Sequence, residues 1–290
     1  MDRRPGTIIS LSDGRSLAYA EYGDPHGRPV FFFHGTPGSR FFRPADEITR
    51  KMGVRLITAD RPGYGLSTFQ PGRRILDWPS DIAELANHLN INRFAVAGHS
   101  GGGPYGMACA AALPGRVSAA ALAAAAGPVD ASAATLGLSL VNKLGFKFGR
   151  YAPWPVFRLL IWVIYHRRRA DPAASMDREN GRRPAADDLQ LLQPAVRAAC
   201  IESETEAFRR GMRGFAWDAR LITRDWGFKL DKILAPVTIW HGSADDLTST
   251  AMARCLANGI PNAHLRLCEN EAHLLLFPHW EEILTQLTSE

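Results

Sequence analysis

The chain has 290 residues, of which 46% are hydrophobic and 22% charged, and its formal net charge is +5. This composition is typical of a globular protein, and the length is sufficient for one large α/β domain or for a core domain that carries an inserted subdomain. The longest dense apolar run, residues 159–165, is much shorter than the ~20 residues that a transmembrane segment needs, and no nucleic-acid-binding motif is visible.

The N-terminus and the cysteines set the expected compartment. No apolar segment of a secretory signal follows residues 1–6. The cysteines form no Cys-x-x-Cys pair, so neither a metal site nor a disulfide framework is indicated. We therefore expect a cytoplasmic protein with reduced, mostly buried thiols, and the sequence leaves open whether it is a monomer or a homodimer.

The first half of the chain alternates strand and helix patterns. Two short apolar segments around Asp13-Gly14 predict an N-terminal hairpin. The continuous apolar run Val30–Phe33 predicts a strand that is buried on both faces. A helix over about 44–51, a strand over 54–59 and a helix over 78–89, capped by Asp77 or Ser80, are expected next.

The following strand, residues 94–97, ends at Gly98-His99-Ser100-Gly101-Gly102. A G-x-S-x-G sequence between an apolar strand and a helix of small residues is typical of a nucleophile elbow. The turn is so sharp that glycine is needed on both sides of the serine. The hydroxyl then lies clear of the sheet, at the positive end of a helix. Taken alone, the pentapeptide also fits a glycine-rich turn with a solvated serine.

In the second half, a long segment interrupts the alternation of strand and helix patterns. Strands are expected over 117–126, 237–240 and 263–268, and a helix over 280–287 closes the chain. Between about 131 and 235 the segment is helix-compatible, punctuated by prolines and too long for a loop. We predict a core of residues 1–130 and 236–290 and a helical cap of residues 131–235. The alternation predicts a mostly parallel, doubly wound sheet whose ligand site lies beyond the carboxyl ends of its strands.

Polar residues with catalytic potential gather at these predicted strand ends. They are His34, Asp60, Ser100, Asp130, Asp245 and His273. Because parallel strands end at the same edge of a sheet, we expect several of these side chains to meet there.

Five motifs carry a resemblance to a known family. In chain order they are His34-Gly35-Thr36-Pro37-Gly38, Asp60-Arg61-Pro62-Gly63-Tyr64-Gly65-Leu66-Ser67, Gly98-His99-Ser100-Gly101-Gly102, Gly242-Ser243-Ala244-Asp245 and Glu271-Ala272-His273. With this order and spacing the chain resembles the α/β-hydrolase family, in its capped, esterase-like branch with a serine nucleophile. The resemblance implies an α/β-hydrolase fold with an N-terminal hairpin and an inserted helical cap. It also implies a serine hydrolase of the carboxylesterase type that needs no cofactor or metal.

The resemblance assigns Ser100 as the nucleophile, His273 as the base and Asp245 as the acid, in the chain order expected for this fold. An alcohol is a weak nucleophile until a base activates it, and the acid holds the base in the correct tautomer. The alternatives that stay open are His241 and His279 for the base, and Asp246 and Asp130 for the acid.

The resemblance also implies roles for residues of the neighbouring loops. The oxyanion hole needs two backbone N–H groups, and the matching residues are Thr36 and Gly101. Pro37 has no N–H group and cannot contribute. His34 is expected to brace this loop, and Asp60 and Arg61 are interpreted as structural.

Aromatic residues of the predicted cap indicate a partly apolar pocket for a small-molecule substrate. The pocket residues expected are His99, Trp154, Phe215 and Trp217. Such a wall favours an apolar acyl or alcohol group without choosing between them.

Several functions share these motifs. A proline-iminopeptidase-like enzyme would use an acidic cap residue for the substrate amine, and Glu202, Glu204 and Glu206 are candidates. A C–C bond hydrolase and a perhydrolase also remain open. A small-ligand receptor with little or no turnover is the alternative outside enzymology. Ser100 argues against dehalogenases and epoxide hydrolases of this fold, which use an aspartate.

Overall fold

One sheet organises the computed structural model, which describes residues 6–128, 136–178 and 184–289. Its eight strands lie in the order β1-β2-β4-β3-β5-β6-β7-β8. Their bounds are β1 (Thr7–Ser10), β2 (Ser16–Gly23), β3 (Arg28–Phe33), β4 (Val54–Ala59), β5 (Phe94–His99), β6 (Val117–Ala123), β7 (Val237–Gly242) and β8 (Ala263–Cys268). β2 pairs antiparallel with β1 and β4, and every other pairing is parallel. The predicted hairpin and the mostly parallel sheet are confirmed.

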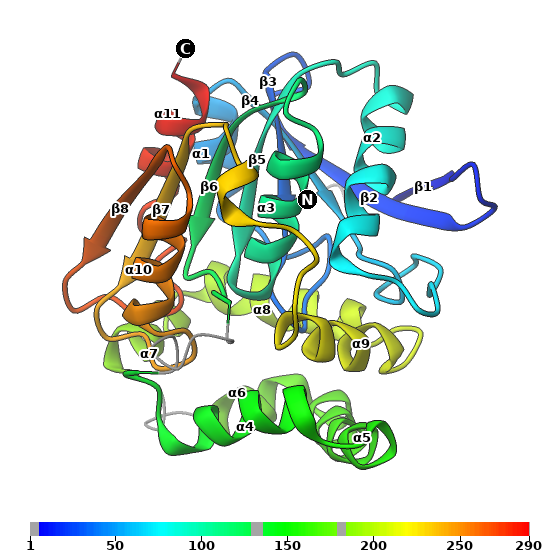
Figure 1. Ribbon diagram of the computed structural model, residues 1–290, viewed down its shortest axis with the longest axis vertical. Coiled ribbons are helices and arrows are strands. Elements are labelled where there is room, and N and C mark those ends of the chain that lie inside the picture. Colours follow the sequence, from blue (N-terminus) through cyan, green and yellow to red (C-terminus); the bar gives the residue numbers. More distant parts are fainter. Residues whose placement is uncertain (1–5, 129–135, 179–183, 290) are drawn as a thin grey trace.

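Helices cover both faces of the sheet (Figure 1). One face is covered by α1 (Asp46–Lys51) and α11 (Trp280–Thr288), and the other by α2 (Trp78–His88), α3 (Gly103–Ala112) and α10 (Thr250–Gly259). Alternate residues of β3 therefore enter different cores: Val30 and Phe32 pack with α11, and Phe31 and Phe33 pack with α2 and α3. The apolar run that predicted a strand buried on both faces is explained by this layering.

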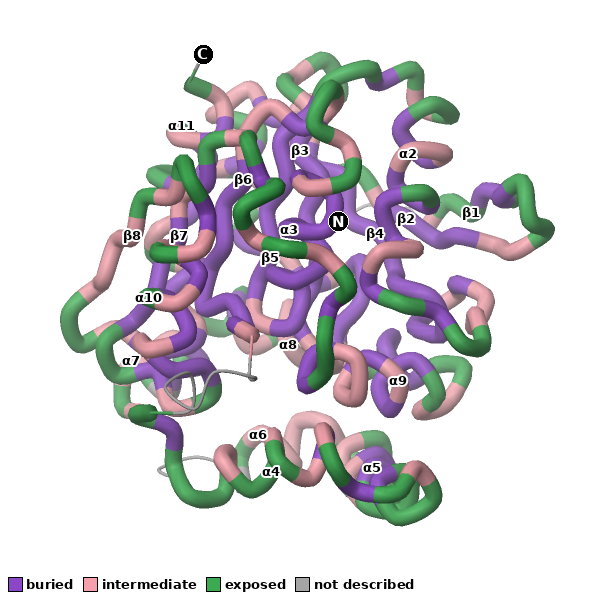
Figure 2. The backbone as a smooth tube through the Cα atoms, in the orientation of Figure 1, coloured by how far each residue is buried: buried purple, intermediate pink, exposed green. Residues whose placement is uncertain are grey.

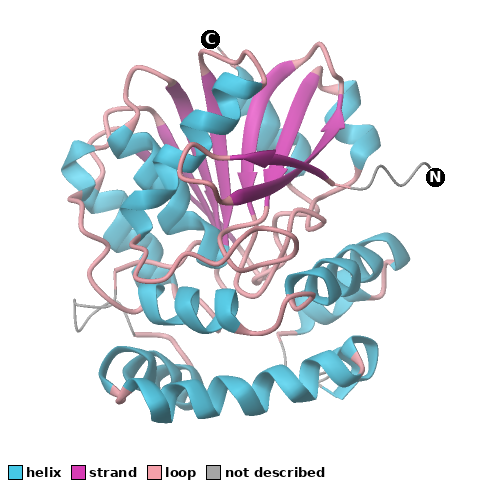
Figure 3. Cartoon of the chain, turned by 90° about the vertical axis from the view of Figure 1, so that its right-hand side faces the viewer, coloured by secondary structure: helices cyan, strands magenta, loops and turns pink. Residues whose placement is uncertain are grey.

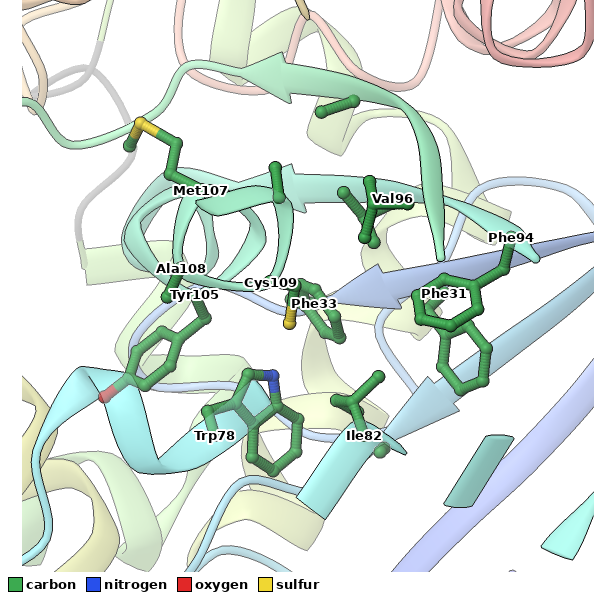
Figure 4. Packing of buried hydrophobic residues seen from close by; sticks show 14 of the residues in the cluster. Phe31, Phe33, Trp78, Ile82, Phe94, Val96, Tyr105, Met107, Ala108 and Cys109 are labelled. Atoms are coloured by element: carbon green, nitrogen blue, oxygen red, sulfur yellow. The ribbon is translucent and has the colours of Figure 1, made fainter. Parts of the chain in front are cut away.

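The larger core holds the strand and the helix on either side of Ser100. Figure 4 shows Phe31, Phe33, Trp78 and Tyr105 between the sheet and the helices α2 and α3. The rings of Phe33 and Trp78 meet edge to face with their centroids 5.7 Å apart. Aromatic pairs in this geometry contribute beyond their buried area. Ser100 thus lies between two elements that are anchored in a closely packed interior.

A helical insertion separates β6 from β7. It comprises α4 (Leu140–Tyr151), α5 (Trp154–Ala170), α6 (Pro172–Arg178), α7 (Ala185–Leu191), α8 (Pro194–Ala207) and α9 (Arg213–Ile222). Pro155, Pro172 and Pro194 lie in first helical turns, where the missing N–H group costs nothing. Pro153 and Pro184 directly precede α5 and α7. The insertion lies beyond the carboxyl ends of the parallel strands, with α4 and α5 farthest from the sheet (Figures 1 and 3).

Burial differs sharply between the two parts of the chain. The sheet and its flanking helices are largely buried, whereas much of α4 and α5 is exposed or half-buried (Figure 2). Among the cysteines Cys109 is buried, but the other three are only half-buried, so the expectation of mostly buried thiols is wrong. Among the described residues, no helix combines the length and the apolar character that a membrane crossing requires.

Candidate active site

Ser100 lies at the tip of a sharp turn between β5 and α3. It opens a short 3-10 turn, η2 (Ser100–Gly102), and its φ of 53° is in the left-handed region that non-glycine residues rarely adopt. A Cβ on Gly98 would lie 2.7 Å from the Gly102 carbonyl oxygen, and a Cβ on Gly102 would lie 2.1 Å from the Phe33 carbonyl oxygen. Glycine is therefore required on both sides of the serine, as the motif predicted.

His273 and Asp245 meet across the carboxyl ends of two adjacent strands. Asp245 follows β7 and His273 follows β8, and the distance from His273 Nδ1 to Asp245 Oδ2 is 2.9 Å. The Asp245 carboxylate also accepts hydrogen bonds from the Thr248 backbone N–H and hydroxyl group, at 3.0 and 2.8 Å. Because an ionised carboxylate only accepts, Nδ1 carries the proton and Nε2 is left to act as an acceptor.

His273 and Asp245 each stabilise the charged form of the other. Burial disfavours the charged form of both groups, but the carboxylate of Asp245 raises the pKa of His273 above its usual value. Burial likewise raises the pKa of Asp245, but His273 outweighs it and lowers that pKa to about 2. Asp245 is therefore ionised and suited to stabilise an imidazolium.

The rival residues lie in other surroundings. His241 is wholly buried, and its Nε2 contacts the Thr248 carbonyl oxygen at 3.0 Å. His279 directly precedes α11, and its Nδ1 lies 3.0 Å from Glu282. Asp246 is half-buried, and Asp130 lies outside the described residues. Of the described acids considered, the one bonded to His273 is Asp245.

A cavity of about 520 Å³ joins Ser100 and His273 and is walled by both the core and the insertion. Ser100 Oγ forms no hydrogen bond with another described residue. The hydrogen bond between a nucleophile and its base often forms fully only when a substrate is bound. Much of the remaining wall is apolar. It includes Phe42, Phe146, Phe157, Leu160, Ile161 and Ile222.

Two of the predicted pocket residues line this cavity and two do not. His99 and Phe215 are part of its wall. Trp154 and Trp217 instead pack against each other, with ring centroids 5.3 Å apart. The Trp217 indole N–H donates to the Arg73 carbonyl oxygen at 2.9 Å, which fixes the ring in the packing between insertion and core. These two tryptophans are therefore corrected from pocket residues to packing residues.

His99 supports the loop that carries His273. Its Nε2 donates to the His273 carbonyl oxygen at 3.0 Å, and its ring stacks on Phe42. Burial, together with the proximity of His273, lowers the pKa of His99 to about 3. The ring is therefore neutral, which fits a bracing role better than proton transfer.

The loop that follows β3 lies against the elbow. A Cβ on Gly101 would lie 2.5 Å from Thr36 Oγ1, and a Cβ on Gly35 would lie 3.4 Å from Ser100 Cβ. The backbone N–H of Thr36 donates to no other described group. His34 Nδ1 contacts the Gly35 carbonyl oxygen at 2.8 Å and so braces the loop as expected. The two N–H groups expected to form an oxyanion hole thus belong to neighbouring segments beside Ser100.

Two contacts from the insertion were missed in the sequence. Asp187 of α7 is buried, lines the cavity and accepts a hydrogen bond of 2.7 Å from the Leu274 N–H. Burial raises the pKa of Asp187 above its usual value. Asn142 of α4 donates to the Asp246 carbonyl oxygen at 2.5 Å. Neither residue belongs to a local motif, since each contact joins segments that are far apart in the chain.

Asp60 and Arg61 are buried away from the cavity, in agreement with a structural interpretation. Asp60 pairs with Arg40, and Arg61 pairs with Asp218 of α9. Among the described residues, no group of three or more His, Cys, Asp or Glu side chains is placed to hold a metal ion. Ser100, His273 and Asp245 bring a hydroxyl, an imidazole and a carboxylate to the site.

The sequence and the fold are similar to those of known proteins. Residues 30–286 match the sequence profile described as "Alpha/beta hydrolase family". The chain is 26% identical over 282 residues to the uncharacterized hydrolase YcgS of Bacillus subtilis (strain 168). That alignment covers 95% of this chain and 93% of the relative. It is 37% identical over 130 residues to the non-heme chloroperoxidase of Streptomyces lividans. That alignment covers 42% of this chain and spans less than half of the relative, 45%.

Among solved structures, a hydrolase from Pseudomonas aeruginosa PA01 matches with a TM-score of 0.72 and 20% identity over 100% of both chains. At that level of identity the likeness concerns the fold. It extends through the sheet, the hairpin and the helical insertion.

Proposed function

Because this chain belongs to the alpha/beta hydrolase family, we propose that it is a serine hydrolase that cleaves a carboxylic ester or a related acyl bond. The fold is the α/β-hydrolase fold, and Ser100, His273 and Asp245 are the proposed triad. The observation that carries the proposal is the 2.9 Å contact between His273 and Asp245, with His273 on the same cavity as the strained Ser100.

The reaction follows from the roles of these groups. Ser100 Oγ attacks the carbonyl carbon while His273 Nε2 takes the hydroxyl proton, and Asp245 stabilises the imidazolium. The carbonyl oxygen becomes an oxyanion that accepts hydrogen bonds from the N–H groups of Thr36 and Gly101. Collapse of this intermediate expels the alcohol, which takes its proton from His273. Water then attacks the acyl-enzyme, again with His273 as base, and the acid leaves as Ser100 regains its proton.

The cavity supports a small, partly apolar substrate. Its volume of about 520 Å³ is in the range of small-molecule pockets. Phenylalanine, leucine and isoleucine side chains form much of its wall. An apolar acyl or alcohol group gains the free energy of leaving water in such a site.

A proline-iminopeptidase-like reaction needs a carboxylate for the substrate amine, and the candidates Glu202, Glu204 and Glu206 all lie on α8. Glu202 does not line the cavity. Glu204 lines the cavity, but Arg168 contacts it at 3.0 Å. Glu206 is held by Arg40 at 2.8 Å and by Arg209 at 3.2 Å. These carboxylates are already paired with arginines, so an ester is the better candidate.

A perhydrolase reaction is the second candidate, because of the partial similarity to the chloroperoxidase of Streptomyces lividans. In that reaction hydrogen peroxide replaces water and takes the acyl group from Ser100. Peracid formation in the presence of peroxide, measured beside hydrolysis, separates the two candidates.

The deciding experiment combines covalent labelling with turnover. We expect a fluorophosphonate probe to label the protein but not Ser100→Ala, and p-nitrophenyl esters of increasing chain length to be turned over many times. The chain-length optimum reports the size of the acyl pocket. Labelling without turnover would favour a ligand receptor or a C–C bond hydrolase that ignores these esters. Failure of the probe to label the protein at all would contradict the triad.

A further inference from the structure

The Arg61 guanidinium is fully buried beneath the loop that follows β3. Its Nη1 donates to the His34 carbonyl oxygen at 2.5 Å, and its Nη2 donates to the Gly35 carbonyl oxygen and to Thr36 Oγ1, each at 2.9 Å. Its Nε donates to Asp218 at 2.7 Å. One side chain thus holds three consecutive residues of the loop and is itself held by a residue of α9.

The contact with Gly35 determines where the next N–H group points. The Gly35 carbonyl and the Thr36 N–H belong to the same peptide unit, which is trans and planar, so the two bonds point in opposite directions. Arg61 and His34 both hold the carbonyl oxygen on the buried side of the loop. The Thr36 N–H is thereby turned away from them, and it donates to no other described group.

A cation on the carbonyl oxygen also polarises the peptide. Hydrogen bonds in a chain strengthen one another, and the effect is larger at low dielectric. A positively charged donor on the Gly35 carbonyl draws electron density from the Thr36 nitrogen, which makes its N–H a better donor. An oxyanion that develops on the far side of the same peptide is stabilised by the same charge.

We propose that Arg61 is a positioning residue for the oxyanion hole, and that Asp218 of the helical insertion sets its position. This inference rests on the proposed serine-hydrolase function. Arg61 does not line the cavity, so it acts through the Gly35–Thr36 peptide and not by touching substrate.

Asp218 is suited to hold Arg61 in position because it is buried and ionised and accepts hydrogen bonds from several side chains. Burial opposes its charge, but Arg73 and Arg61 lower its pKa below the usual value. Its Oδ2 accepts from Arg61, and its Oδ1 accepts from Arg73 and from the Tyr105 hydroxyl. Two arginines face one aspartate, which leaves this buried cluster with an excess positive charge next to the oxyanion loop.

Two further contacts tie the same loop to the insertion. The Ser39 N–H donates to the Ser203 hydroxyl at 2.9 Å, and Arg40 Nη1 contacts Glu206 at 2.8 Å. Both partners lie on α8. The loop is therefore supported by α9 at one end and by α8 at the other, so that the insertion contributes to the geometry of the oxyanion hole.

The test compares Arg61→Lys with Arg73→Lys. Both arginines are buried and both contact Asp218, but Arg73 contacts Tyr105 and not the oxyanion loop. Lysine keeps the charge but cannot present the planar fork that reaches several acceptors. We expect Arg61→Lys to lose about 30-fold or more in kcat with KM nearly unchanged, since removal of one oxyanion donor costs about 10²–10³-fold. Arg73→Lys should retain kcat within about threefold.

A second readout separates this role from general support of the fold. A trifluoromethyl ketone forms an oxyanion adduct with the serine, whereas a substrate carbonyl in the ground state does not depend on the hole to the same extent. The affinity of Arg61→Lys for this inhibitor should fall in parallel with kcat. Thermal unfolding of both variants controls for stability.

Each outcome bears on the inference. Equal losses of kcat in the two lysine variants, or an unchanged inhibitor affinity in Arg61→Lys, would overturn it. If Arg61→Lys does not fold, the isosteric Asp218→Asn decides by the same two readouts, and retention of wild-type kcat and inhibitor affinity there also overturns it. A wild-type protein that neither labels at Ser100 nor turns over esters would instead contradict the proposed function itself.

Discussion

The carboxylate of Asp187 accepts a hydrogen bond of 2.7 Å from the backbone N–H of Leu274, the residue that follows His273. Helix α7 of the insertion is thereby fastened to the loop that carries the proposed base. The Asp187 charge also acts on His273 and contributes to the rise in the pKa of its imidazole, although less than Asp245 does.

The first prediction concerns the activity of the wild-type protein as a function of pH. Burial opposes the imidazolium of His273, but Asp245 and Asp187 raise its pKa above the ordinary 6.5. Because the base must be neutral to accept the Ser100 proton, kcat/KM should fall as the pH drops through a midpoint above 6.5. The measurement is kcat/KM for a p-nitrophenyl ester across the pH range in which the protein stays folded. A midpoint below 6.5 would contradict the assignment.

The second prediction is that Asp187→Asn moves this acidic limb to lower pH. Asparagine can still accept from the Leu274 N–H, but it removes a negative charge that favours the imidazolium. The pKa of His273 should therefore fall, and the neutral base should persist at lower pH. Asp187→Ala is the matched variant, because it removes the charge and the hydrogen bond together and should also reduce kcat. A limb that stays in place in Asp187→Asn would show that the charge does not reach His273.

The third prediction ranks the acidic residues. Asp245→Asn should reduce kcat by about 10³–10⁴-fold, because an amide favours the wrong tautomer of the histidine. Asp246→Asn changes the neighbouring, half-buried side chain, so it should leave kcat within about threefold. Asp130→Asn should likewise cost far less than Asp245→Asn. The comparison is made by steady-state kinetics, and the reverse ranking of Asp245 and Asp130 would move the acid to the end of the earlier strand.

The fourth prediction concerns the backbone of the elbow. A Cβ on Gly102 would lie 2.1 Å from the Phe33 carbonyl oxygen, which belongs to the sheet and cannot move aside cheaply. Gly102→Ala should therefore lower the free energy of unfolding by about 3 kcal/mol or more. Gly115→Ala has open space around the new Cβ and should change it by less than about 0.5 kcal/mol. Denaturant unfolding of both variants measures the difference, and equal midpoints would show that the elbow can relax.

Local patterns predicted the strands of this chain well. Runs such as Val30–Phe33 and the alternation over residues 263–268 are short, bounded by turn residues, and form β3 and β8. The Ala-rich segment after residue 117 has helix propensity, yet it forms β6 because it is paired on both sides, with β5 and β7. Its position in the order of elements predicted this better than its composition.

Helix ends, and some whole helices, were harder to predict from the sequence than the strands. Asp77 precedes α2, but its carboxylate accepts from the Arg74 N–H at 2.7 Å instead of capping that helix. Ser80 lies inside the helix. Helix α10, which covers the sheet between β7 and β8, was not predicted, although Ser249 marks its start: the hydroxyl of Ser249 accepts from the Met252 N–H at 3.3 Å.

Some features of the candidate site could be predicted from local sequence, and others could not. Ser100, Asp245 and His273 belong to motifs at strand ends, where local sequence and chain order place them together. The contact between Arg61 and Asp218 joins residues 157 positions apart, and that between Asp187 and Leu274 joins residues 87 positions apart. No local pattern marks such pairs. Trp154 and Trp217 were misplaced because aromatic composition does not distinguish a ring that packs two layers together from one that faces a cavity.

The insertion departs from and returns to two strands that are direct neighbours in the sheet, β6 and β7. A helical module attached at a single point in this way is open to exchange, in evolution or by grafting, without a change in the strand order. In this chain, however, such an exchange would remove the carboxylates of α9 and α8 that pair with Arg61 and Arg40. Arg40 would keep Asp60 of the core, but Arg61 would be left as a buried cation without a carboxylate, which is strongly destabilising. A transplanted module would therefore have to bring a carboxylate to the place of Asp218, so the core constrains the sequence of the insertion.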